Sequence, residues 1–156
     1  MAVERDDLDA TGHRYCVVAA RFNELYVRRL VEGALQVLRG RGAAGADVEV
    51  VWVPGSFELP LACRWAALTG RFDAVLAFGV LIQGETEHFR LVADASARGL
   101  QEVALSTGIP VLDGVLAVYD AAQAEARAGG AVGNRGAEVA LAAVQMAALR
   151  RGPSFR

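Results

Sequence analysis

Short, strongly apolar runs alternate with longer amphipathic stretches along the chain. Four runs have the length and composition of buried strands, at residues 14–20, 48–53, 73–82 and 110–118. The stretches between them repeat apolar positions at helical spacing and predict helices at 23–38, 57–69, 87–107, 121–128 and 134–150. This alternation predicts an α/β fold in a single domain, residues 1–156, built as a three-layer α/β/α sandwich. Its four-stranded parallel sheet carries helices on both faces.

Local signals support several boundaries of these elements. Asn23 and Asn134 stand where helices begin and are expected to cap them. Pro60 falls in the first turn of its helix, where proline is tolerated. Residues 129–133 are rich in glycine and predict a flexible connector. Residues 1–12 are polar and acidic, which is typical of a terminal tail or arm.

Three loops follow the first three strands, at residues 20–23, 54–60 and 84–89. In a doubly wound sheet these loops meet at one edge, beyond the carboxyl ends of the strands, where ligands bind. Gly84 and the backbone N–H groups after it could hold an anion at a helix N-terminus. His88 lies one turn further along and could transfer a proton near neutral pH. The combination suggests chemistry on a small phosphorylated molecule.

Each candidate side chain in these loops also has a simpler interpretation. Phe22 could stack on a flat heterocycle, or it could belong to the core. Ser56 and Glu58 could hydrogen-bond a polyol, or they could cap a helix. His88 could equally be a solvated surface histidine.

Two further candidates lie later in the chain. Arg127 ends a short helix, where a cation is favourable, but its guanidinium could also clamp a phosphate through two parallel hydrogen bonds. Glu138 could orient His88 or face water. From the residues alone these alternatives stay open.

Composition and charge narrow the possible chemistry. All 16 basic residues are arginine, so a Schiff base on a lysine of the protein is excluded. The net charge of −2 gives no electrostatic case for nucleic acid. The pattern contains no metal-ligand spacing, dinucleotide fingerprint, phosphate-binding P-loop or nucleophile elbow. Cys16 and Cys63 sit in apolar patterns and are expected to be buried thiols. No apolar run reaches the roughly 18 residues of a membrane span, so a cytoplasmic protein without membrane contact is expected.

Six ordered motifs together resemble those of the lumazine synthase family (6,7-dimethyl-8-ribityllumazine synthase). They are ARFNELYVRRLVEGAL, VPGSFELPLA, FDAVLAFGVLIQGETEHF, GLQEVALSTGIPVLDGVL, EARAG and GNRGAEVALAAVQMA, and they span nearly the whole chain. The resemblance implies a flavodoxin-like sheet. It also implies the condensation of 5-amino-6-ribitylamino-2,4-pyrimidinedione with 3,4-dihydroxy-2-butanone 4-phosphate, with release of phosphate and water. The reaction belongs to riboflavin biosynthesis and requires no metal or organic cofactor.

The resemblance also implies roles by motif position. His88 would be the general acid/base and Glu138 its partner. The ring and the ribityl chain would be bound by Phe22, Asn23, Ser56, Glu58, Leu81, Ile82, Asp113 and Arg135. The phosphate would be bound by Glu85, Thr86 and Arg127. The sequence departs from the usual family pattern at Gln83, Glu87, Arg90, Asp113 and Arg135.

Assembly is the last implication of the resemblance. The family forms pentamers whose active sites lie between neighbouring subunits, and some members go on to decamers or icosahedral shells of 60 chains. His88 and Phe22 would come from one subunit, and Asp113, Arg127, Arg135 and Glu138 from the next. The N-terminal arm could add to a neighbour's sheet. Two other functions remain open from the sequence: a weakly active or non-catalytic protein that binds lumazine or flavin, and a shell-forming structural protein.

Overall fold

A four-stranded parallel sheet forms the centre of the computed structural model, which describes residues 8–155. The strands follow the order β2-β1-β3-β4, and they are β1 (Tyr15–Ala20), β2 (Val48–Val53), β3 (Ala74–Ile82) and β4 (Val111–Val118). Tyr15 pairs with Val48 on one side and with Ala74 on the other. The predicted four-stranded parallel sheet is therefore confirmed, and its order is that of a flavodoxin-like fold.

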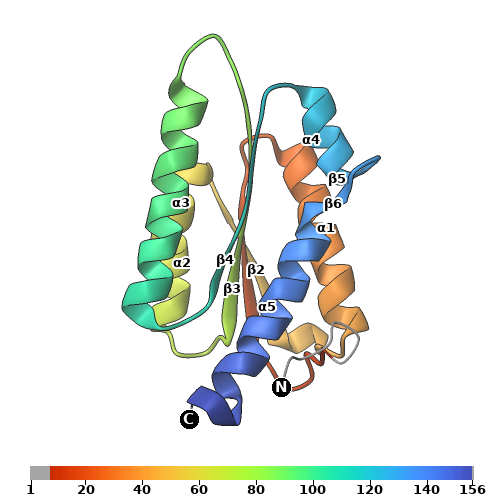
Figure 1. Cartoon of the computed structure of the whole chain (residues 1–156), viewed down its shortest axis with the longest axis vertical. Helices are drawn as coiled ribbons and strands as arrows, with labels where there is room; N and C mark the ends of the chain where they lie inside the picture. Colours follow the sequence, from red (N-terminus) through yellow and green to blue (C-terminus); the bar gives the residue numbers. More distant parts are fainter. Residues whose placement is uncertain (1–7, 156) are drawn as a thin grey trace.

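Helices cover both faces of the sheet (Figure 1). One face carries α1 (Glu24–Gly40), α4 (Ala121–Arg127) and α5 (Arg135–Arg151), and the other carries α2 (Leu59–Leu68) and α3 (His88–Thr107). No helix in the described part of the chain is long and apolar enough to cross a membrane. The three-layer arrangement predicted from the alternating pattern is confirmed.

The sheet divides the core into two apolar clusters, one under each helical layer. Strand β3 is central and almost wholly buried, which explains why its sequence is a continuous apolar run rather than an alternating one. Helices α1 and α5 approach closely because Gly136 has no side chain. A methyl group at this position would collide with the backbone of Leu30. Asn134 caps α5 as predicted: its Oδ1 accepts hydrogen bonds from the N–H of Gly136 at 2.8 Å and of Ala137 at 3.2 Å.

Some boundaries differ from the sequence predictions. The helix expected at 57–69 begins as a 3-10 turn, η3 (Ser56–Glu58), and becomes α-helical only at Leu59. The connector at 129–133 is ordered by a small hairpin of β5 (Ala128–Gly130) and β6 (Gly133–Asn134). Two further 3-10 turns are η2 (Gly45–Asp47) and η4 (Pro153–Phe155).

The predicted N-terminal arm is described only from residue 8 onward. Leu8 and Ala10 are buried in the core, and the N–H of Ala10 donates to the carbonyl of Arg41 at 2.9 Å. These residues therefore pack against the body of the protein rather than forming a free tail. Residues 1–7 lie outside the described residues.

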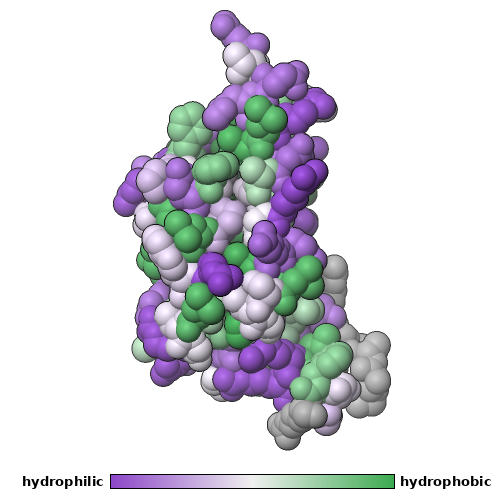
Figure 2. All heavy atoms as spheres, turned by 90° about the vertical axis from the view of Figure 1, so that its left-hand side faces the viewer, coloured by the Kyte–Doolittle hydropathy of each residue, from purple (hydrophilic) through white to green (hydrophobic). Residues whose placement is uncertain are grey.

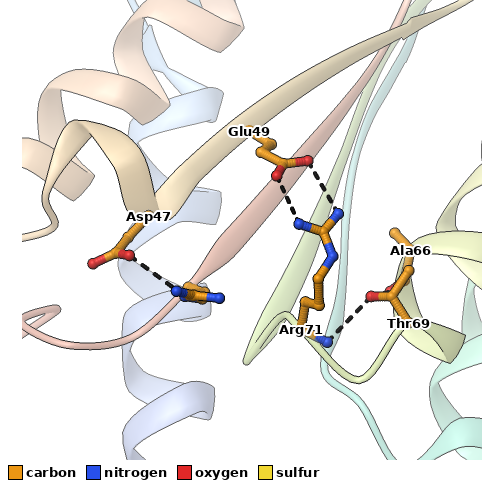
Figure 3. A network of polar contacts seen from close by, with 6 residues as sticks. Asp47, Glu49, Ala66, Thr69 and Arg71 are labelled. Carbon is orange, nitrogen blue, oxygen red and sulfur yellow. Dashed lines mark hydrogen bonds and ion pairs between the residues drawn. The ribbon is translucent and has the colours of Figure 1, made fainter.

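Ion pairs hold the edge strand β2 to its surroundings (Figure 3). Arg71 donates two hydrogen bonds to Glu49, at 2.9 and 3.4 Å, and its own N–H donates to the hydroxyl of Thr69. Arg14 pairs with Asp47 at 3.5 Å. These contacts lie near the start of β2, so they secure the edge strand at the end opposite the loops that carry the candidate site.

Candidate functional site

A cavity of about 830 Å³ opens beyond the carboxyl ends of the strands. All three of the loops singled out in the sequence contribute to its wall. The lining residues are Phe22, Pro54, Gly55, Ser56, Phe57, Glu58, Leu81, Ile82, Gly84, Thr86, His88, Phe89, Leu91 and Val92. The predicted convergence of the loops is therefore confirmed, whereas the chemical roles of these residues stay predictions.

Asn23 shapes the first loop in a way that the sequence did not indicate. It stands at the N-cap position of α1, but its side chain makes no capping bond, so the capping prediction is wrong. Instead its amide Nδ2 donates to the carbonyl of Val80 at 2.7 Å. The ladder between β1 and β3 ends at Ala19 and Phe78, and the side chain supplies a donor to β3 beyond that point. The backbone of Asn23 is left-handed, with φ of 59°.

The second loop is joined to the first by backbone hydrogen bonds. The N–H of Arg21 donates to Val53 at 2.8 Å, and the N–H of Phe22 donates to Pro54 at 3.1 Å. Ser56 is buried against β3, where Gly79 makes space for its hydroxyl. Glu58 is exposed at the cavity wall and makes no side-chain cap to α2. The interpretation of the Glu58 side chain as a helix cap is therefore wrong.

The third loop leads into α3. His88 is the first residue of that helix; its side chain is exposed toward the cavity, and its N–H donates to the hydroxyl of Thr86 at 3.3 Å. The ring of Phe89 meets Tyr119 edge-on at 6.5 Å, which connects this loop to the end of β4. Glu87 and Arg90 form an ion pair at 3.5 Å on the exposed side of the helix start.

Six predicted site residues do not line the cavity of the single chain, and one of them is Asn23, described above. Arg127 donates to the carbonyl of Gln123 within α4 at 3.3 Å, the helix-end contact that was one of its two interpretations. Arg135 and Glu138 pair with each other at 2.9 Å on the first turn of α5, so Glu138 does not contact His88 within this chain. The other two are Asp113, whose carboxylate accepts from the N–H of Val115, and Glu85.

Sequence reasoning missed several apolar residues of the wall. Phe57, Leu91 and Val92 line the cavity, and Phe57 and Leu91 are about two-thirds exposed there. Leu91 and Val92 follow His88 at the i+3 and i+4 positions of a helix, so they share its face. That spacing was a usable signal.

The walls define what the cavity can do. Aromatic and aliphatic side chains suit a flat ring, while Ser56 and Glu58 offer hydrogen-bonding groups. His88 can exchange a proton with a bound molecule. Among the described residues that line the cavity there is no arginine, and no group of three or more metal-ligating side chains occurs in the described chain. A guanidinium clamp on a phosphorylated ligand would therefore have to come from outside this cavity wall.

Comparison with known proteins adds a family to this geometry. Residues 12–151 match the sequence profile of the 6,7-dimethyl-8-ribityllumazine synthase family. The chain is 48% identical over 135 residues to the protein of that name from Gemmatimonas aurantiaca, covering 86% of this chain and 82% of the relative. It is 45% identical over 144 residues to the protein of the same name from Chlorobium phaeobacteroides, covering 92% and 93% of the two chains. For the Xanthomonas euvesicatoria protein of that name the identity is 46% over 140 residues, covering 90% and 91%.

Proposed function

Because the chain belongs to the 6,7-dimethyl-8-ribityllumazine synthase family, we propose that the cavity at the carboxyl ends of the strands is its active site. The enzyme is a transferase of riboflavin biosynthesis. It condenses 5-amino-6-ribitylamino-2,4-pyrimidinedione with 3,4-dihydroxy-2-butanone 4-phosphate and releases phosphate. The observation that carries the assignment of the site is the convergence of Phe22, Ser56, Glu58 and His88 on one cavity.

The pyrimidine ring and its ribityl chain fit the larger part of this cavity. Phe22 offers an exposed aromatic face for stacking, and Leu81 and Ile82 supply the apolar floor at the end of β3. Ser56 and Glu58 bind the ribityl hydroxyls. Asn23 contributes through its backbone, since its side-chain amide is already engaged with Val80.

The reaction steps match the side chains available. The substrate amine attacks the ketone and loses water to form an imine, which needs no lysine from the protein. A proton then leaves the carbon next to the imine and phosphate is expelled. The second amine closes the ring with loss of another water. His88 serves as the base and later as the acid, because it is the histidine on the cavity wall.

Phosphate departure requires a positive charge, and the cavity wall offers none besides His88. We therefore place Arg127 of a neighbouring copy over Thr86 and Glu85, with Glu138 of that copy beside His88. Asp113 and Arg135 of the neighbour would complete the ring-binding end. In this arrangement the enzyme is a homo-oligomer, a pentamer in its simplest form, which could pair into a decamer or close into a 60-chain shell.

Exposed apolar side chains support association of the chain with copies of itself. The face formed by α2 and α3 carries green patches among polar ones over its whole height (Figure 2). Large apolar side chains that are more than half exposed on these two helices are Leu61, Trp65, Leu68, Leu91 and Leu105. Such surface is typical of an interface. Cys16 and Cys63 are free thiols, which suits the reducing cytoplasm in which we propose that the enzyme works.

The direct test is formation of the lumazine from both substrates, followed by its absorbance. The wild-type protein is compared with Arg127→Ala and with Arg39→Ala, an exposed arginine in the last turn of α1. We expect turnover in the wild type and in Arg39→Ala, and a loss of about 10²- to 10³-fold in Arg127→Ala because the leaving phosphate loses its clamp. Absence of turnover in the wild type would contradict the proposed function. Equal turnover in all three proteins would contradict the phosphate clamp alone.

A further inference from the structure

Trp52 on the edge strand lies under two guanidinium groups. The guanidinium carbon of Arg28 is 5.0 Å from the centre of its ring system and that of Arg21 is 5.3 Å away. Glu24 joins the two cations, with hydrogen bonds of 2.7 Å from Arg21 and 3.3 Å from Arg28. We call these four residues the Trp52 cluster. It lies beside the cavity but contributes none of its lining residues.

The Trp52 cluster encloses the turn that presents Phe22. Arg21 directly precedes Phe22, and Glu24 follows it by two residues. The ring of Phe22 is 66% exposed, so contacts of its own side chain do little to fix it. Its position depends on its own N–H, which donates to the carbonyl of Pro54, and on the flanking residues, which include the left-handed Asn23. Arg21 contacts the Trp52 ring directly, and Glu24 is linked to that ring through its hydrogen bonds with Arg21 and Arg28. Both ends of this turn are therefore held by the same tryptophan ring.

We propose that Trp52, acting through Arg21 and Glu24, is a positioning residue that holds Phe22 at the angle required to stack on the pyrimidine ring. The inference rests on the proposed function for its substrate. Trp52 itself does not touch the substrate. Cation–π contacts at a partly buried ring are individually modest, so the effect is a graded loss of ring binding rather than an abolition of chemistry.

The test compares Trp52→Ala with Trp52→Phe, which keeps an aromatic face for the cations. Val51→Ala is the matched control, because Val51 is the neighbour of Trp52 on β2 and its side chain points to the other face of the sheet. Steady-state kinetics are measured with each substrate varied in turn on the assembled proteins. For Trp52→Ala we expect the KM of the pyrimidinedione to rise by about three- to tenfold, with kcat and the KM of the phosphorylated substrate within about twofold. Trp52→Phe restores most of the loss, and Val51→Ala shows none.

Amide hydrogen exchange provides a readout that does not depend on turnover. In Trp52→Ala the segment 21–26 should exchange faster, while the core strands β1 and β3 stay protected. If the wild type were inactive but this local loosening appeared, the positioning contact would stand and the proposed function would fall. If the KM values of both substrates rose together, or exchange increased throughout the protein, the role of Trp52 would be structural and the inference would be overturned. It would also be overturned if Trp52→Ala matched the wild type.

Discussion

Replacement of Asn23 separates two physical contributions to the geometry of the site. Asn23→Ala removes the hydrogen bond from the side-chain amide to the carbonyl of Val80 and keeps a side chain on a left-handed backbone. Asn23→Gly removes the same hydrogen bond but relieves the backbone, because glycine adopts positive φ without steric cost. Both variants thus lose the hydrogen bond to Val80, and only Asn23→Ala keeps the steric strain of a side chain at positive φ.

The structure sets the expected magnitudes. The carbonyl of Val80 lies beyond the last residue pair of β1 with β3, so without Asn23 a partly buried acceptor loses its partner, at a cost of about 1–3 kcal/mol. Alanine in the left-handed region adds about 1 kcal/mol. We expect Asn23→Ala to lower the free energy of unfolding by about 2–4 kcal/mol and Asn23→Gly by about 1 kcal/mol less.

Denaturant unfolding at one fixed protomer concentration measures both values, with the midpoint and the slope compared with those of the wild type. A loss below about 0.5 kcal/mol in Asn23→Ala would refute the importance of the contact with Val80, since a value that small is typical of an ordinary surface substitution. If Asn23→Gly were as damaging as Asn23→Ala, the strain attributed to the left-handed backbone would be refuted instead.

Three further predictions concern the packing and the ionisation of the fold. Gly79→Ala should raise the KM of the pyrimidinedione in steady-state kinetics, because the new methyl group displaces the hydroxyl of Ser56; an unchanged KM would show that Ser56 does not hold this substrate. Gly136→Ala should lower the free energy of unfolding by about 2–3 kcal/mol in denaturant titrations, since its methyl group collides with the neighbouring backbone of α1, whereas Gly40→Ala, with open space around it, should be neutral or slightly stabilising. Burial, assisted by the nearby Glu49, raises the pKa of Cys16 from 9.0 to about 11. The unfolded chain therefore loses its thiol proton first, and the free energy of unfolding should fall by about 2–3 kcal/mol between pH 9 and 11. Cys16→Ala should lose that part of the slope; an identical pH dependence in both proteins would contradict the shift.

Much of the fold could be predicted from the sequence because its local and tertiary requirements agree. Strand β3 is buried on both faces, so its apolar run marked it to within one residue of its observed start and at its observed end. Asn134 caps α5 and at the same time donates to the carbonyl of Arg29, so the local signal was reinforced by packing. The convergence of the three loops followed from the direction of parallel strands alone.

Other features depended on contacts that local pattern does not contain. The side chain of Asn23 turned to Val80 because the β1–β3 ladder ends just before it, which only the register of the sheet reveals. The hairpin at 128–134 replaced a flexible connector because its strands pair with each other. The roles of Arg127 and Glu138 remain predictions, since the polar contacts of Arg127 with Gln123 and of Glu138 with Arg135 lie within their own helices.

The measurement that tests the shared active site most directly is complementation between two inactive variants. His88→Ala and Arg127→Ala are assayed separately for lumazine formation, then unfolded, mixed in equal amounts and reassembled. If each site takes its histidine from one copy and its arginine from the next, random mixing regenerates intact sites with a frequency of about one in four. The proposed arrangement therefore predicts recovery of about a quarter of wild-type turnover. Turnover that stays at the level of the separate variants, while reassembled wild type regains full activity, would contradict it.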